Sequence, residues 1–297
     1  MSDGVTGAAR VGVVGLGSMG GAVASRLLAR GFDVVVSDLD EEKVDRLVEQ
    51  GARRPGGPIG QACEVLITSL PADAAVREVL LEQGVLADLG GRTLIELSTL
   101  LPGTMHVLAE AAARHGVRVI DCPVSGGPNE ALAGSLVLLV GGDDADVEGV
   151  QDVFDALGKV WRVGRPGDAK LVKLINNMMA AGNLALAAEA FTLGTRLGVD
   201  PQRLYEIIHN SGGQSRTFSK RVPYVLANDL SARFPLYLTE KDTRLFLEVA
   251  DEHGADPHLA REVQRRYAHA LERGLGNLDM AAIFLASGQD AEPAADA

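Results

Sequence analysis

The chain of 297 residues has few aromatic residues, few cysteines and an excess of negative over positive charge. With aromatics at 4%, its interior must be built mainly from aliphatic side chains and alanine. The two cysteines, Cys63 and Cys122, form no paired motif, which is typical of a reducing compartment and gives no disulfide framework. A net charge of -12 argues against nucleic acid or an anionic membrane surface as the main partner.

The sequence also lacks targeting, membrane-spanning and metal-binding patterns. Residues 1–10 lack the charged and apolar regions of a signal peptide. The longest apolar segment, Met178–Phe191, is interrupted by Asn183 and Glu189. The six histidines have no recognisable metal-ligand spacing. We therefore expect a soluble, cytoplasmic protein with no metal ion and no membrane partner.

What the first half of the chain contains is a regular alternation of short apolar segments and helical patterns. This alternation is typical of a doubly wound α/β fold, in which helices cover both faces of a parallel sheet. The predicted strands are Val11–Val14, Val34–Ser37, Val65–Thr68, Thr93–Glu96, Val117–Ile120, Leu136–Val140 and Val160–Val163. The predicted helices between them are Ser18–Arg30, Glu41–Gln50, Ala74–Leu81, Thr104–His115 and Ala145–Leu157.

The second half is predicted to be helical throughout. A long helix over Ala169–Leu197 ends at Gly198, and Asp200-Pro201 starts the next one. We therefore place a nucleotide-binding domain at residues 1–165, an all-α domain at 166–290 joined by this long helix, and a disordered tail at 291–297. Further helices are predicted at Pro201–Asn210, Thr239–Glu252 with a capping box formed by Thr239 and Asp242, Ala260–Gly274 and Asp279–Leu285.

A glycine-rich loop follows the first predicted strand and opens the first helix. Gly15 allows a tight turn, Gly17 lets the backbone approach a pyrophosphate, and Gly20 lets the helix pack closely on the strand. An acidic residue ends the next strand about twenty residues further on. This context predicts a Rossmann-type dinucleotide site. The residues expected to bind the cofactor here are Gly15, Leu16, Gly17, Ser18, Met19, Gly20 and Asp38.

Asp38 favours NAD over NADP. A carboxylate at this position can accept hydrogen bonds from both ribose hydroxyls but repels a 2′-phosphate. No arginine or lysine follows until Lys43, so a phosphate clamp is not evident. Two alternatives stay open: the glycines could be turns in a protein that binds no dinucleotide, and Asp38 could cap the helix Glu41–Gln50.

Three further segments lead from this general reading to a particular family. They are Asp121–Gly127, Gly164–Gly167 leading to Lys173 and Asn177, and Lys241-Asp242. Together with the glycine loop they resemble the β-hydroxyacid dehydrogenase family, which contains 3-hydroxyisobutyrate dehydrogenase and tartronate semialdehyde reductase. The resemblance covers about residues 10 to 287. It implies a Rossmann domain, a long interdomain helix, an all-helical domain that mediates homodimers or homotetramers, and a cleft between the domains.

The resemblance implies that Lys173 is the catalytic acid or base and that Asn177 holds the substrate. The two residues are four apart, so a helix places them on one face. The apolar helix around Lys173 would favour its neutral amine, as proton transfer near neutral pH requires. We expect Lys173 to take the substrate's hydroxyl proton as hydride leaves carbon for the nicotinamide, although a lysine here could also be a solvated surface residue.

Other segments are expected to contact the substrate or the cofactor. Ser125, Gly126 and Gly127 offer a hydroxyl and two backbone N–H groups suited to a carboxylate, and their alternative is a simple turn. Cys122, beside them, is expected to be a packed residue and not a reactive thiol. By resemblance, Lys241 would contact substrate or cofactor. Two loops similar to cofactor loops of the family, or else ordinary turns, are Leu70-Pro71 and the loop with Thr99.

The chain departs from the family's usual pattern near the lysine. Ala169 replaces a glycine, and Lys170 replaces an uncharged polar residue. If Lys170 faces the cleft it would lower the pKa of Lys173 further and attract an anion; otherwise it is exposed. The segment Ser211–Phe218 reads as a loop or broken helix in which Arg216 is a possible second anion contact.

We expect an NAD(P)-dependent oxidoreductase acting on a small anionic 3-hydroxy acid or its semialdehyde, such as 3-hydroxyisobutyrate or tartronate semialdehyde. Glyoxylate, succinic semialdehyde and a branched hydroxymethyl dicarboxylate stay open as substrates. The alternatives are an imine reductase, which generally lacks the Pro123–Gly127 segment and replaces the lysine, and a catalytically silent relative, which would be expected to lose the lysine. A phosphosugar dehydrogenase would be longer and richer in cations.

Overall fold

The computed structural model describes residues 9–287, so the tail predicted at 291–297 lies outside the described residues. The chain divides into two compact units, Met1–Lys173 and Leu174–Ala297. The boundary between them falls inside one long helix, α10 (Asp168–Arg196).

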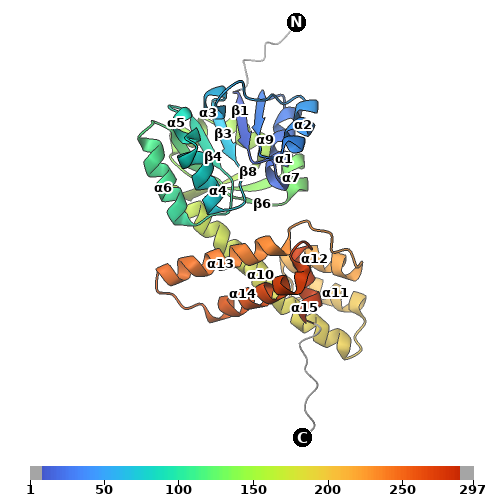
Figure 1. Ribbon diagram of the computed structural model, residues 1–297. Coiled ribbons are helices and arrows are strands. Elements are labelled where there is room, and N and C mark those ends of the chain that lie inside the picture. The colour runs from blue at the N-terminus through green and yellow to red at the C-terminus, as the bar shows by residue number, and fades with distance from the viewer. Residues whose placement is uncertain (1–8, 288–297) are drawn as a thin grey trace. The chain divides into compact units, whose positions relative to one another are not determined.

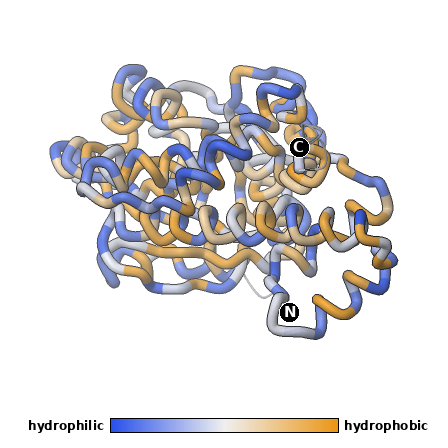
Figure 2. The backbone as a smooth tube through the Cα atoms, turned by 90° about the horizontal axis from the view of Figure 1, so that it is seen from below, coloured by the Kyte–Doolittle hydropathy of each residue, from blue (hydrophilic) through white to orange (hydrophobic). Residues whose placement is uncertain are grey.

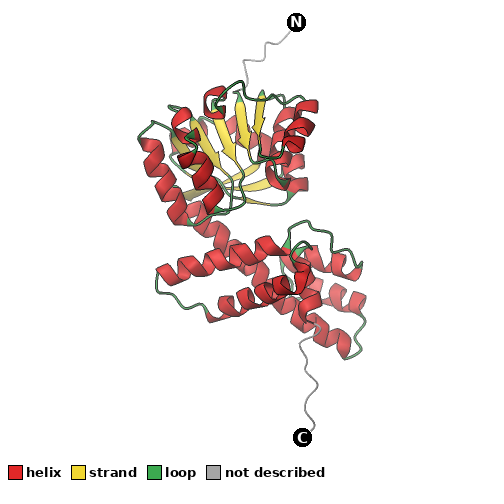
Figure 3. Cartoon of the chain, viewed as in Figure 1, coloured by secondary structure: helices red, strands yellow, loops and turns green. Residues whose placement is uncertain are grey.

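The first unit is built on a sheet whose central part is parallel (Figure 3). Its five central strands are short and rich in β-branched residues, and they are almost wholly buried because helices cover both faces. The predicted Rossmann-like α/β fold is confirmed. Along the sheet the order of the parallel strands is β2 (Val34–Ser37), β1 (Val11–Val14), β3 (Val65–Thr68), β4 (Thr93–Glu96) and β5 (Arg118–Asp121).

Alternate strand residues fill two separate cores, one on each face of the sheet. Val65 and Ile67 of β3 point into one core, whereas Leu66 points into the other. Figure 1 shows the two helical layers on either side. The first core is covered by α1 (Ser18–Ala29), α2 (Glu41–Glu49), α7 (Pro128–Ala133) and α9 (Gln151–Leu157). The second is covered by α3 (Ile59–Ala62), α4 (Asp73–Arg77) with the π-helical turn Glu78–Glu82, α5 (Val85–Asp88) and α6 (Pro102–Ala113).

The sheet is not parallel throughout, which differs from the expectation. β7 (Leu136–Gly141) runs antiparallel to β5 and to the short strand β6 (Val124–Ser125), and β8 (Gly158–Gly164) then pairs in parallel with β7. Between β6 and β7 lies only the six-residue helix α7, whereas a parallel crossover needs about a dozen residues or more. The chain therefore turns back on itself at this point.

Both cysteines are packed inside the first unit. Cys122 is fully buried at the end of β5, and Cys63 follows α3. Burial raises the pKa of the Cys63 thiol to about 11 and also raises that of Cys122. The prediction that Cys122 is a packed residue is confirmed.

The described residues of the second unit form helices joined by loops, with no strand among them, as predicted. Its core forms around α10, whose Ala181, Leu184 and Ala188 are fully buried. Phe191, also on α10, packs its ring against Phe218 and Phe284. The surrounding helices are α11 (Pro201–His209), α12 (Arg216–Leu226), α13 (Leu236–Glu252), α14 (His258–Ala270) with the π-helical turn Leu271–Leu275, the 3-10 turn Met280–Ala282 and α15 (Ile283–Ser287).

Two local predictions were wrong, and one helix was not predicted. α13 begins at Leu236, so Thr239 lies inside the helix and forms no capping box with Asp242. Residues 211–215 form a loop, as predicted, but α12, for which no helix was predicted, then begins at Arg216, and Ser215 caps it by accepting a hydrogen bond from the Phe218 N–H. The helix predicted over 145–157 is interrupted between α8 (Asp144–Glu148) and α9.

α10 exposes part of its apolar surface. Met179, Leu186 and Leu193 are exposed although the opposite face of the helix is buried. Figure 2 shows hydrophobic and hydrophilic residues alternating along the helical segments of the chain. By length and composition alone, α10 is long and apolar enough to cross a membrane, contrary to the sequence-based expectation. Its fully buried alanines and leucine identify it equally as the central helix of a helical core.

Candidate active site

The residues predicted for cofactor and substrate in the first unit lie in loops that follow neighbouring parallel strands. β1 to β5 are in register, so their carboxyl ends meet at one edge of the sheet. This is the edge at which open α/β sheets bind ligands. The structure therefore brings together loop segments that are far apart in the sequence. The last residues of the five strands are, across the sheet, Ser37, Val14, Thr68, Glu96 and Asp121.

Each of the three glycines in the loop has a different structural role. Gly15 has a φ of +86°, which favours glycine. A Cβ on Gly20 would collide with the carbonyl oxygen of Gly15, so any side chain would force α1 away from the turn. A Cβ on Gly17 would meet no atom within 4 Å. The space beside Gly17, at the N-terminus of α1, is therefore open to a pyrophosphate, and the residues present fit a dinucleotide.

Asp38 is held beside the glycine loop. Its Oδ2 accepts a hydrogen bond of 2.5 Å from the Leu16 N–H, and its Oδ1 accepts one of 2.9 Å from the Asp40 N–H. Asp40, not Asp38, caps α2 by accepting from the Glu42 N–H. The alternative role of Asp38 as the cap of this helix is therefore wrong. The Lys43 ammonium lies 3.1 Å from Asp40 and 4.0 Å from Asp38.

Two loops expected to contact the cofactor are tied to each other. The Leu70 N–H donates to the Ser98 hydroxyl at 2.8 Å. The Leu101 N–H donates to the Asp73 carboxylate at 3.0 Å. These two hydrogen bonds therefore hold together the loop containing Leu70-Pro71 and the loop containing Thr99. From the sequence, Ser98 was predicted only as part of the loop with Thr99 and Asp73 was not predicted, because the partners of both residues are distant in the chain.

The turn proposed to hold a substrate carboxylate has one donor fewer than expected. Gly126 has a φ of +133° and lies against Glu130, as a turn reserved for glycine requires. The Gly127 N–H, expected to face the substrate, instead donates to the Glu130 carboxylate at 2.8 Å. The Ser125 hydroxyl and the Gly126 N–H are then the donors that this turn can offer.

Lys170 is neither exposed nor in an open position beside Lys173, so both sequence-based alternatives for it were wrong. Its side chain is fully buried in the first unit. The ammonium lies 2.7 Å from Glu96 Oε2 and 3.0 Å from Asp121 Oδ1, and it donates to the Glu96 carbonyl at 3.0 Å. Burial alone would lower the pKa of Lys170, but the charges of Asp121 and Glu96 and their hydrogen bonds raise it above its ordinary value.

Lys173 and Asn177 lie one turn apart on α10. The Lys173 side chain is 9% exposed, so the predicted proton-transfer residue is buried and not solvated. In the second unit the Asn177 amide donates to Asp242 Oδ2 at 2.6 Å, and the Lys241 ammonium lies 3.4 Å from Asp242 Oδ1. Asp242 belongs to a segment that carries the family resemblance, but its role was misassigned: it was placed in a capping box, whereas it holds two of the predicted site residues.

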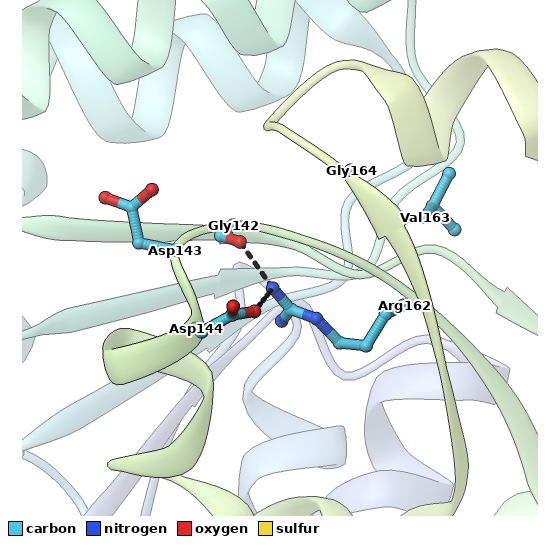
Figure 4. Close-up of a pocket in the computed structure, with 6 residues that line it drawn as sticks. All are labelled: Gly142, Asp143, Asp144, Arg162, Val163 and Gly164. Carbon is cyan, nitrogen blue, oxygen red and sulfur yellow. Dashed lines mark hydrogen bonds and ion pairs between the residues drawn. The ribbon is translucent and has the colours of Figure 1, made fainter.

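A separate hollow of about 350 Å³ lies where β7 and β8 end, and Figure 4 shows its lining. Arg162 donates to the Gly142 carbonyl at 2.6 Å and to Asp144 Oδ1 at 2.7 Å. The guanidinium charge is thus already paired with a carboxylate. This hollow contains none of the predicted site residues and does not suit an anionic substrate.

Arg216, the possible second anion contact, is the first residue of α12. Among the described residues, the structure shows no hydrogen bond or ion pair between Arg216 and another predicted site residue.

Comparison with known proteins agrees with the fold and the segments described above. Residues 10–167 match the NAD binding domain of 6-phosphogluconate dehydrogenase. Residues 167–286 match the domain described as NAD-binding of NADP-dependent 3-hydroxyisobutyrate dehydrogenase. The sheet, its glycine loop and these two matches define an NAD(P)-dependent oxidoreductase of hydroxy acids.

The relatives make the assignment more specific. The 2-(hydroxymethyl)glutarate dehydrogenase of Eubacterium barkeri is 32% identical over 281 residues, 93% of each chain. The 3-hydroxyisobutyrate dehydrogenase of Pseudomonas aeruginosa is 36% identical over 253 residues, 81% of this chain and 85% of that protein. The chain belongs to the β-hydroxyacid dehydrogenase family, which includes 3-hydroxyisobutyrate dehydrogenase, and the predicted family is confirmed.

Solved structures show the same fold. A 3-hydroxyisobutyrate dehydrogenase from Mycobacterium tuberculosis, determined with L-serine, has a TM-score of 0.86 at 27% identity and covers 94% of this chain and 98% of its own. An imine reductase from Myxococcus stipitatus has a TM-score of 0.65 at 20% identity over 93% of this chain and 99% of its own. The likeness to the imine reductase extends to the fold alone.

The glycine loop gives a first test. In Gly17→Ala we expect NADH to bind at least about tenfold more weakly, because the new methyl group occupies the open space beside the helix N-terminus. The melting temperature should change by no more than about 4 °C, since no atom is displaced. Gly20→Ala is the matched comparison: its methyl group meets backbone, so it should lower the melting temperature clearly.

Both variants can be measured by NADH fluorescence titration and thermal unfolding. Unchanged NADH affinity in Gly17→Ala would show that the pyrophosphate does not lie over this glycine.

Proposed function

We propose that this protein oxidises a short 3-hydroxy acid, or reduces the corresponding semialdehyde, with Lys173 as the proton-transfer residue. The observation that carries the proposal is the buried Lys173 one helical turn from Asn177, whose amide is oriented by Asp242. A bound nicotinamide would supply the hydride acceptor in oxidation and the hydride donor in reduction.

In the proposed oxidation, Lys173 in its neutral form takes the hydroxyl proton as the carbon becomes a carbonyl, and in reduction it returns that proton. Asn177 donates a hydrogen bond to the reacting oxygen. Its amide can do so in a defined direction because Asp242 holds it, at 2.6 Å in this structure. The Ser125 hydroxyl and the Gly126 N–H hold the substrate carboxylate. Each of these groups binds, orients or moves a proton, and none needs a metal ion.

Three of the relatives have names or bound compounds that share one chemical form, while others act on L-threonate, on glyoxylate or succinic semialdehyde, or on 3-sulfolactaldehyde. Of these three, one is a dehydrogenase of 2-(hydroxymethyl)glutarate, one of 3-hydroxyisobutyrate, and one was solved with L-serine. All three compounds carry a CH₂OH group on the carbon next to a carboxylate. We infer that the substrate of this protein has the form HOCH₂–CHR–COO⁻, with the group R undetermined.

We also infer that NAD is the preferred cofactor. Asp38 stands beside the glycine loop, where a carboxylate accepts ribose hydroxyls and repels a 2′-phosphate. Lys43, the nearest following cation, is paired with Asp40. An imine reductase or a catalytically silent relative is disfavoured as an alternative, because the chain keeps Lys173 in a buried position together with the Pro123–Gly127 segment.

A second copy of this chain is the proposed partner of the apolar stripe on α10. Met179, Leu186 and Leu193 are spaced by seven residues, so they follow one face of the helix, and they are 63%, 67% and 59% exposed. Such a stripe is self-complementary when two identical helices pack about a two-fold axis. We propose a homodimer, or a homotetramer built from it.

The proton-transfer role predicts that Lys173→Ala lowers kcat by about two to four orders of magnitude, as expected for loss of general acid–base catalysis. NADH affinity should stay within about twofold, because the glycine loop is untouched. The measurement is the absorbance of reduced nicotinamide with NAD and a panel of 3-hydroxyisobutyrate, 2-(hydroxymethyl)glutarate and L-serine. Lys159→Ala, on the exposed strand β8, is the control and should be fully active. Equal turnover in Lys173→Ala would contradict the mechanism.

The cofactor preference predicts a kcat/KM at least about tenfold higher with NAD than with NADP. Asp38→Asn should reduce this ratio, since the amide carries no charge to repel the 2′-phosphate. Asp45→Asn, on the exposed side of α2, should leave the ratio unchanged. A wild-type preference for NADP would overturn this part of the proposal.

If the stripe on α10 forms the dimer interface, a Met179→Glu/Leu186→Glu variant should sediment as a 31.1 kDa monomer, whereas the wild type should sediment at a multiple of that mass. Leu259→Glu, at an even more exposed apolar position on α14, should leave the assembly unchanged. Sedimentation velocity distinguishes these outcomes. A monomeric wild type that binds lipid vesicles would instead assign the stripe to a membrane.

A further inference from the structure

A row of polar side chains crosses the buried sheet of the first unit. Thr68, Glu96 and Asp121 end three adjacent parallel strands, and they are directly paired in the register of the sheet. All three side chains are at 0% exposure. Lys170, from the first turn of α10, places its ammonium between the two carboxylates. We call these four residues the buried polar cluster.

Within the buried polar cluster the carboxylates also accept bonds from the backbone. Asp121 Oδ2 accepts from the N–H groups of Gly167 and Lys170, at 2.8 and 3.2 Å. Glu96 Oε1 accepts from the Ser98 N–H at 3.0 Å and from the Thr68 hydroxyl at 3.4 Å. The cluster therefore fixes the start of α10 and the loop after β4, besides joining the ends of the strands.

Each member of the cluster is followed closely by a residue of the proposed site. Leu70-Pro71 follow Thr68, Thr99 follows Glu96, and Ser125 follows Asp121. Lys173 follows Lys170 by three residues on the same helix, less than one turn away. The cluster is thus the one place in the described first unit where all these segments are bonded together.

We propose that Lys170 is a positioning residue: through Glu96 and Asp121 it sets the place of Lys173 relative to the loops that carry Thr99 and Ser125. This inference rests on the proposed function of Lys173. A purely stabilising role does not require charges here, because apolar residues of similar volume pack equally well and avoid the desolvation of three charged groups. What the ionic cluster adds is a pair of close ion contacts from one ammonium to two strand ends, together with a hydrogen bond to the Glu96 carbonyl.

The test compares Lys170→Met with Arg221→Met. Arg221 is a matched control because it is a second buried cation paired with a carboxylate, 2.8 Å from Asp279, but in the second unit and apart from the proposed site residues. Both variants should unfold at lower temperature. Only Lys170→Met should lower kcat per folded molecule, by about tenfold to a hundredfold, because misplacing a reacting group by about 1 Å costs that much. NADH affinity should stay within about twofold.

If Lys170→Met fails to fold, Glu96→Gln serves in its place, since it keeps the side-chain shape and removes one charge of the cluster. It should lower kcat with little change in KM. Unchanged kcat per folded molecule in either variant, beside a loss of stability equal to that of Arg221→Met, would overturn the proposal and leave a structural role only.

A second measurement does not depend on turnover. Hydrogen exchange followed by mass spectrometry should show faster exchange in Lys170→Met at residues 168–173, 97–101 and 122–127 together, with the glycine loop unchanged. If the wild type oxidises no hydroxy acid, the proposed function fails while this experiment still tests the positioning. Faster exchange confined to α10 would show that Lys170 does not hold the two loops.

Discussion

The ammonium of Lys170 neutralises part of a buried charge that the sheet could not otherwise tolerate. Two carboxylates that end neighbouring strands, Glu96 and Asp121, are completely removed from water. Leaving either without its cation costs about 3–5 kcal/mol, a large share of the 5–15 kcal/mol that keeps a typical domain folded. The parallel arrangement of β3, β4 and β5 and the attachment of α10 to the first unit are therefore linked through one side chain.

This dependence explains why the candidate site is assembled from segments so distant in sequence. A parallel sheet covered on both faces collects the carboxyl ends of its strands at one edge, and the loops leave from there. The edge needs internal bonds if the loops are to hold fixed positions. In this protein the bonds are those of the buried polar cluster, of Ser98 with the Leu70 N–H, and of Asp73 with the Leu101 N–H.

The parts of the fold that the sequence predicts well are those encoded by local pattern. β1 to β4 begin and end at the predicted residues, because each is a short β-branched run bounded by turn residues. α12 was missed because Pro223 inside it breaks the helical pattern. The reversed direction of β7 was missed because a strand's apolar pattern does not state which way it runs.

The predictions for the candidate site also divide into those encoded by local pattern and those that depend on distant contacts. The glycine loop follows from a local motif, whereas Lys170 and Asp242 were misjudged because their partners lie far along the chain. The hydrogen bond that the Gly127 N–H donates to Glu130 is local, and a glutamate at the third position of a helix could have indicated it from the sequence. Burial and pairing of charges depend on tertiary contacts, which a single sequence shows only through resemblance.

The Lys170 cluster also has a consequence for the exchange of parts between relatives. A β4 or β5 segment taken from a relative without these acids would leave Lys170 of this chain without its partners. In the reverse exchange, β4 or β5 of this chain would bring a buried acid into a relative that has no cation at the Lys170 position. The turn proposed to hold the substrate carboxylate, between Val124 and Gly134 and beyond the end of β5, is therefore easier to redesign than a whole strand-and-loop unit. In a lineage, the lysine and its two acids should be gained or lost together.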